Sequence, residues 1–183
     1  MTVCESCLKF DLPDNGSRHH ETVNLTNKPK IDLEILLKGV WRWVEVKNWL
    51  SPEIPSQHLA AKRLEFFAKT QDDDYWYSLG ANAQGTHDFL TARNERPANP
   101  NFIFLYKSAD AMPASVDIAI LESKISTFPD LQDVKPSVLD RQTFGSLFPE
   151  LNVRECVLES DLTCQDAALS TCTRLRKMKR VKP

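Results

Sequence analysis

The chain has 183 residues, of which 42% are hydrophobic and 26% charged, a composition typical of a soluble α/β or α+β protein and not of a disordered or fibrous one. This length is expected to give one globular domain with tails. No apolar run approaches the roughly 20 residues that a membrane-spanning helix needs, and the start MTVCESCLKF does not resemble a signal peptide. We therefore expect a soluble, cytoplasmic protein without a membrane association.

The formal net charge of −2 is unevenly distributed along the chain. Residues 1–150 carry 16 Lys and Arg against 21 Asp and Glu, whereas residues 151–183 carry 7 against 4. The acidic majority argues against a protein that binds nucleic acid by charge alone. It is compatible with an enzyme whose carboxylates hold a divalent cation, because the cation restores positive potential where a phosphate arrives.

Three segments are expected in chain order. Residues 1–28 form a polar N-terminal segment with a turn at DLPDNGS, and residues 29–150 form the core. Residues 151–183 form a C-terminal segment of helix-compatible composition that ends in a basic tail. This tail could attract phosphates without regard to sequence, or it could serve only to keep the chain in solution.

Two strands are predicted directly after the N-terminal segment. In KIDLEILL, residues 30–37, apolar and acidic side chains alternate, which predicts a strand with one buried face. WRWVEVKNW, residues 41–49, is rich in aromatic and β-branched residues, as is typical of a half-buried strand. Lys38 and Gly39 lie between the two runs and predict the turn of a β-hairpin.

The rest of the core is predicted with less regular patterns. Residues 56–70 predict a helix that ends at the acidic run 72–74, and residues 101–107 predict a buried strand. Residues 75–100 show no firm periodicity, and residues 136–148 predict a short helix. Together these elements predict an α/β fold in which helices flank a mixed sheet.

The hairpin would bring two carboxylates together. A turn centred between Lys38 and Gly39 places Asp32 opposite Glu45, and directly paired side chains have Cβ atoms roughly 4.5–5.5 Å apart. Carboxylates at this separation repel each other unless a proton or a cation lies between them, and Mg²⁺ or Mn²⁺ suits carboxylate ligands. Lys47 shares the face of Glu45, where its ammonium could assist the attacking water in phosphodiester hydrolysis.

The stretch PKIDLEILLKGVWRWVEVKNWL resembles motifs II and III of the PD-(D/E)XK nuclease superfamily. The resemblance is carried by Asp32, which follows Pro29 closely, and by the tripeptide Glu45-Val46-Lys47 on the next strand. It implies that Asp32 and Glu45 are metal ligands, that the Val46 carbonyl is a third ligand, and that Lys47 is the catalytic lysine.

The same resemblance implies a restriction-endonuclease-like fold and two further site residues. Glu21, in the segment before the hairpin, is the candidate for the N-terminal acid of the family. Gln57, at the start of the next helix, matches the glutamine that some branches carry there, although Ala61 stands where an aromatic residue often follows. The resemblance covers about residues 20–70.

The resulting hypothesis is a Mg²⁺- or Mn²⁺-dependent endonuclease that acts on nucleic acid, with DNA favoured over RNA. Restriction or repair, a mobile element and a toxin held by a protein inhibitor are all compatible contexts. The alternative is a non-catalytic module that keeps the nuclease-like fold and binds nucleic acid or a protein partner.

An acid-x-Lys pattern occurs three times, so the tripeptide alone is weak evidence. The competitors are Glu122-Ser123-Lys124, in a stretch that could be strand or helix, and Asp133-Val134-Lys135. Only the tripeptide at 45–47 belongs to a strand that faces another acid.

A non-functional interpretation of the hairpin is a solvated outer face on which Lys47 simply pairs with a neighbouring carboxylate. Trp41 and Trp43 share this face with Glu45 and Lys47. Their presence predicts that helices or substrate cover the face.

The cysteines are expected to be reduced thiols, because five is an odd number and their spacing is irregular. Cys4 and Cys7, with His19 and His20, have the residue types of a small zinc site. Their spacing fits no common zinc finger closely, so a structural zinc is disfavoured.

Overall fold

The fold is known from a computed structural model, which describes residues 1–20, 30–50, 54–108 and 114–155. Its strands are β1 (Thr2–Glu5), β2 (Leu8–Asp11), β3 (Arg18–His19), β4 (Leu33–Leu37), β5 (Val40–Asn48), β6 (Asn101–Lys107), β7 (Lys135–Asp140) and β8 (Arg154–Glu155). Its helices are α1 (Leu59–Thr70), α2 (Asp73–Thr91), α3 (Ala114–Ile125) and α4 (Arg141–Leu147), with short 3₁₀ turns η2 (Ser56–His58), η3 (Pro129–Leu131) and η4 (Pro149–Leu151). No helix in these ranges is long and apolar enough to cross a membrane.

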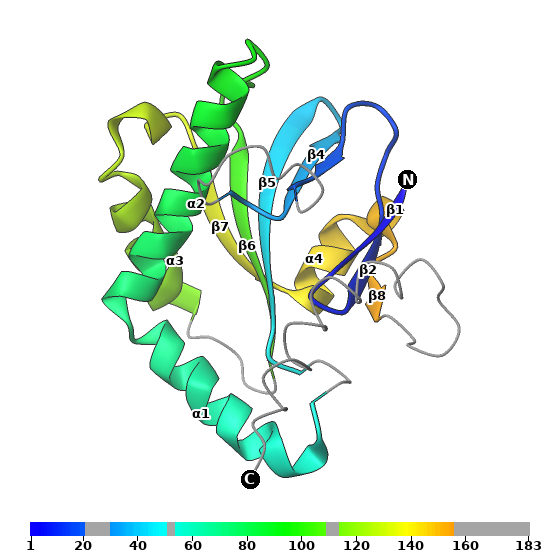
Figure 1. The fold of residues 1–183 in the computed structure, drawn as a ribbon, viewed down its shortest axis with the longest axis vertical. Coiled ribbons are helices and arrows are strands. Elements are labelled where there is room, and N and C mark those ends of the chain that lie inside the picture. The colour runs from blue at the N-terminus through cyan, green and yellow to red at the C-terminus, as the bar shows by residue number, and fades with distance from the viewer. Residues whose placement is uncertain (21–29, 51–53, 109–113, 156–183) are drawn as a thin grey trace, which may run out of the picture.

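The larger sheet has the strand order β3-β4-β5-β6-β7 and is mixed. Strand β4 runs antiparallel to its neighbours β3 and β5, whereas β6 and β7 are parallel to β5. Parallel neighbours need a crossover connection, which α1 and α2 supply between β5 and β6 and α3 supplies between β6 and β7. The expected α/β architecture, a mixed sheet flanked by helices, is therefore confirmed (Figure 1).

The β4–β5 hairpin has the predicted register. Leu33 pairs with Val44 and Leu37 pairs with Val40, so the turn lies between Lys38 and Gly39. Both turn residues have positive φ, 51° and 75°, as two-residue type I′ turns require. The turn thereby sets which side chains of the two strands face each other.

Both faces of this sheet are covered. The face toward α1, α2 and α3, here called the helical face, packs aromatic side chains such as Trp43 and Phe104 against the helices. The opposite face, here called the hairpin face, packs Val44 and Val46 against α4 and the smaller sheet β1-β2-β8. Successive residues of β5 thus enter two different cores.

The N-terminal segment contributes to the hairpin face. Strands β1 and β2 form an antiparallel pair, and Leu8 and Phe10 are fully buried. Strand β8 pairs with β2 and extends the same small sheet. The basic tail and the rest of the predicted C-terminal helical segment, residues 156–183, lie outside the described residues.

One predicted element is wrong, and one predicted helix end is confirmed. The helix predicted over 136–148 is strand β7 followed by α4, because β7 is an edge strand, where a proline such as Pro136 is tolerated. Helix α1 does end at Thr70, directly before the acidic run. The run also begins the next helix, because Asp72 caps α2, its side chain accepting a hydrogen bond from the Asp74 N–H at 3.1 Å.

Candidate metal centre

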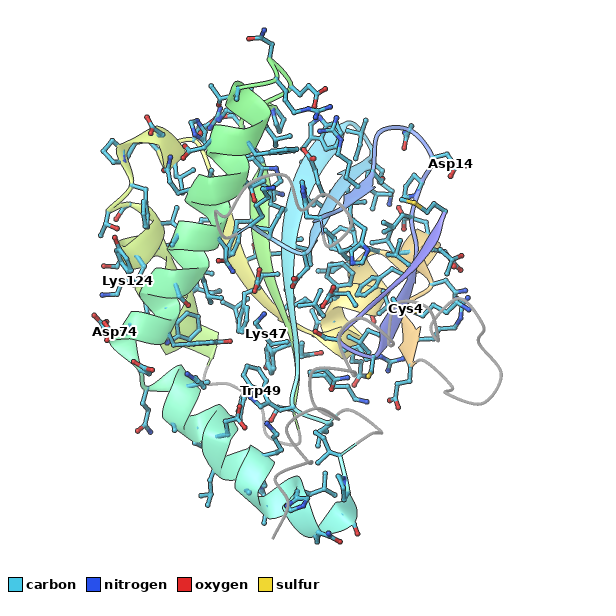
Figure 2. The ribbon with its side chains drawn as sticks, in the orientation of Figure 1. Cys4, Asp14, Lys47, Trp49, Asp74 and Lys124 are labelled. Carbon is cyan, nitrogen blue, oxygen red and sulfur yellow. The ribbon has the colours of Figure 1, made fainter. Side chains whose placement is uncertain are left out.

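Strand β5 presents Glu45 and Lys47 on the helical face. Glu45 is almost fully buried, with 2% of its surface exposed. The Lys47 ammonium donates a hydrogen bond to Glu45 Oε1 at 2.6 Å, and 35% of the Lys47 side chain is exposed. Lys47 lies on the side of β5 that faces α1 and α2 (Figure 2). The pair therefore connects a buried carboxylate with the surface. The expectation of a solvated face is wrong, because Glu45 and Glu34 are buried, but Lys47 does pair with a neighbouring carboxylate, as the non-functional interpretation expects.

Asp32 is held at the point where β4 begins. Its backbone N–H donates to the Val44 carbonyl at 3.1 Å, and its carboxylate Oδ2 accepts a hydrogen bond from the Val46 N–H at 2.6 Å. The carboxylate thus replaces the missing strand partner of Val46, which places it beside Glu45. The structure brings Asp32, Glu45 and Lys47 together, as the hairpin register predicts.

The charges of this group perturb one another. Burial, and then repulsion from Glu45 and Glu5, raises the pKa of Asp32 well above its usual range, although Lys47 opposes this effect. Burial alone would lower the pKa of Lys47, but Glu45 and Asp32 outweigh it, so the net effect is to raise the pKa above its usual range. Lys47 is therefore protonated at neutral pH and acts as a hydrogen-bond donor, not as a base.

Several buried polar atoms on the helical face lack hydrogen-bond partners in the described part of the chain. They include Glu45 Oε2 and the Tyr75 hydroxyl, and also Glu34 Oε2, Trp43 Nε1 and both ring nitrogens of His20. Buried polar atoms are normally paired, so a concentration of unpaired ones points to a ligand. Carboxylate oxygens prefer hard cations, so the donor set around Glu45 and Asp32 fits Mg²⁺ or Mn²⁺.

Glu5 is a third carboxylate that the sequence did not reveal. It ends β1, is buried, and has Oε2 3.1 Å from His19 Nε2. The turn after it docks on the end of β5, where Asn48 Nδ2 donates to the Ser6 carbonyl at 2.9 Å. Contacts between these distant segments bring Glu5 near Asp32, so no local pattern could have indicated it.

Within the described residues, the structure does not bring the other candidates implied by the family resemblance to Asp32, Glu45 and Lys47 as free ligands. The Val46 carbonyl accepts a long hydrogen bond of 3.3 Å from Ser6 Oγ, so that oxygen is engaged. Gln57 lies exposed in η2, and no contact within the described ranges joins it to Asp32, Glu45 or Lys47. Glu21 lies outside the described residues.

Both competing acid-x-Lys patterns are excluded as alternative sites of this kind. Glu122 and Lys124 belong to α3, where residues two apart do not share a face, and Lys124 pairs with Asp73. Asp133 pairs through both oxygens with the Arg96 guanidinium, which lowers the pKa of Asp133.

The four-residue zinc site is not assembled. Cys4 is disulfide-bonded, so the expectation of a reduced thiol is wrong for this residue. The His19 ring contacts Glu5, and both His20 ring nitrogens are buried without a hydrogen-bond partner in the described ranges. A disulfide sulfur is not the thiolate ligand that zinc requires.

A separate group of metal-type ligands lies between α2 and η3. Ligand atoms of His87, Asp88 and Asp130 lie within 4.8 Å of one another, the one such group of three found in the described ranges. The Gln84 amide nitrogen donates to Asp88 at 2.7 Å and to Asp130 at 3.2 Å. The two carboxylates are therefore already bridged by a neutral donor.

Comparisons of this chain with family models, with curated proteins and with solved structures found no match.

Proposed function

We propose that this chain is a metal-dependent nuclease of the PD-(D/E)XK type, with a restriction-endonuclease-like fold, that hydrolyses phosphodiester bonds in DNA. One observation carries the proposal: Glu45 is buried beside Asp32, with one oxygen bound to Lys47 and the other without a hydrogen bond from any residue that the structure describes. A purely structural ion pair would have little reason to leave a buried carboxylate oxygen unsatisfied.

Asp32 and Glu45 would hold the cation, with Glu5 as a third carboxylate within electrostatic reach of Asp32. When bound, Mg²⁺ or Mn²⁺ supplies Lewis-acid polarisation of the phosphoryl oxygen. The cation would also neutralise the repulsion that raises the pKa of Asp32. The acidic character of the core is thus part of the proposed site.

Lys47 would supply a second positive charge at the site, in addition to that of the cation. Its ammonium has three N–H donors, of which one is directed to Glu45. Because part of its side chain is exposed, a phosphodiester can approach from solvent. The remaining donors would orient the attacking water and stabilise the charge that develops on the phosphoryl oxygens.

The helix that follows β5 supports an anionic polymer as the substrate. Lys62, Arg63 and Lys69 lie on α1, which carries one acidic residue, Glu65. Lys69 extends toward the site, with Nζ 5.3 Å from the centre of the Tyr75 ring. These cations would contact phosphates on either side of the scissile one.

The test is cleavage of plasmid, linear DNA and RNA, with Mn²⁺ or with a chelator, by the wild type and two lysine variants. Lys47→Ala should lower the DNA cleavage rate by about 100- to 1000-fold, because it removes a donor from the transition state. Lys124→Ala, in the competing pattern on α3, is the matched control and should cleave at the wild-type rate. Equal cleavage by Lys47→Ala and the wild type would overturn the assignment.

A further inference from the structure

Tyr75 places a hydroxyl in the candidate metal centre from a third element. It lies in the first turn of α2, and its ring packs edge-on against Trp49 and Phe104, with centroid distances of 6.5 Å and 6.3 Å. A phenylalanine would make the same ring contacts. The hydroxyl therefore needs an explanation of its own.

The Tyr75 hydroxyl is buried and has no hydrogen-bond partner in the described part of the chain. Leaving such a group unsatisfied destabilises a fold. Burial raises the pKa of Tyr75, and the charges of Glu45 and Asp32 raise it further while Lys47 opposes them, so the hydroxyl senses all three site residues. It stays protonated at neutral pH and is available as a donor.

Two cations act on Tyr75. Lys69 Nζ lies 5.3 Å from the ring centre, and the charge of Lys47 opposes the rise in the pKa of the hydroxyl. A ligand that accepts a hydrogen bond between two ammonium groups is expected to be anionic, and a phosphate oxygen has this chemistry.

We propose that Tyr75 contacts the substrate by donating a hydrogen bond to a non-bridging oxygen of the phosphodiester that Lys47 faces. This inference rests on the proposed nuclease function. It adds to the site a neutral donor from α2, in addition to the carboxylates and the lysine that the β-hairpin supplies.

The experiment compares Tyr75→Phe with Tyr77→Phe, the same chemical change two residues along α2, where Tyr77 is 49% exposed. We expect Tyr75→Phe to lower kcat/KM for DNA by about 10- to 100-fold, the effect of one hydrogen bond to a charged group. Its thermal midpoint should equal or exceed that of the wild type, because an unsatisfied hydroxyl is removed. Tyr77→Phe should match the wild type in both measurements.

A second measurement separates this inference from the proposed function. Binding of a short labelled DNA duplex, with Ca²⁺ in place of Mn²⁺, is measured by fluorescence anisotropy. Weaker binding by Tyr75→Phe than by Tyr77→Phe supports the contact even if the wild type cleaves nothing, a result that would defeat only the proposed nuclease. Equal binding and equal cleavage, or a lower thermal midpoint for Tyr75→Phe alone, would overturn the role of Tyr75.

Discussion

The two faces of the larger sheet are built from the same strands but differ in the polar groups that they bury. On the hairpin face, Val44 and Val46 pack into an apolar core with Phe144 of α4. On the helical face, Glu45 and Glu34 are equally buried, and each keeps one carboxylate oxygen without a hydrogen-bond partner in the described ranges. Glu34 Oε2 nevertheless lies 3.7 Å from both Arg18 and His20. Burial alone does not distinguish the faces. In the described ranges both faces have buried polar atoms without a hydrogen bond, but on the hairpin face these are the Nε atoms of Arg42 and Arg141, whereas on the helical face they include carboxylate oxygens. Both faces stabilise the fold through an apolar core, and the helical face in addition retains acceptor groups that a cation can satisfy.

The largest expected effect on stability belongs to the hairpin face. Phe144→Ala removes a fully buried ring that stacks edge-on with Phe10 and Phe148. We expect the free energy of unfolding to fall by about 3–5 kcal/mol, because a cavity remains. Urea denaturation measures this change. A loss below about 1 kcal/mol would mean that the core on the hairpin face contributes little to stability.

On the helical face, one substitution should raise the free energy of unfolding instead of lowering it. Asp32→Asn removes a buried charge while the amide oxygen can still accept the Val46 N–H. We expect the free energy of unfolding without metal to rise by about 0.5–2 kcal/mol at neutral pH.

The pH dependence of this gain follows from the raised pKa of Asp32. The carboxyl binds a proton more tightly in the folded chain than at its ordinary pKa of 3.8, so the wild type loses stability as the pH rises above that value toward the folded pKa. Urea denaturation at several pH values should therefore show the advantage of Asp32→Asn growing with pH.

Asp133→Asn is the matched control, because it should change the free energy of unfolding in the direction opposite to Asp32→Asn. Its partner Arg96 lowers the pKa of Asp133, so this carboxylate stabilises the fold above pH 3.8 and loses that contribution as the pH falls through the folded pKa. Asp133→Asn should lose up to about 1 kcal/mol at neutral pH and approach the wild type in acid. The same direction of change in both asparagine variants would contradict the contrast between the two carboxylates.

The hairpin was predictable from sequence because its information is local. Lys38 and Gly39 define the turn, the turn defines the register, and the period of two places Lys47 with Glu45. Glu5 was not predictable, because only the docking of the β1–β2 turn on the end of β5 brings it to the site.

Helix α2 was not predicted from the sequence, and the reason is different. Its buried residues do recur at helical spacing, but they include Gly80, Ala83 and Thr86 beside Trp76 and Leu90. Small residues allow α2 to approach its neighbours, as where a Cβ on Gly80 would lie 2.7 Å from a ring carbon of Phe128. A search for large apolar side chains therefore misses the helix, and with it Tyr75.

Calorimetric titration with Mn²⁺ tests the candidate metal centre at Asp32 and Glu45 most directly. All proteins would carry Asp130→Asn, which removes one ligand from the separate group on α2 and η3. We predict Mn²⁺ binding in this background, the same affinity after adding Glu122→Gln, and at least tenfold weaker binding after adding Glu45→Gln, since Glu45 supplies a carboxylate ligand. Unchanged affinity in the Glu45→Gln protein, or no binding in the background protein, would contradict a metal centre at Asp32 and Glu45.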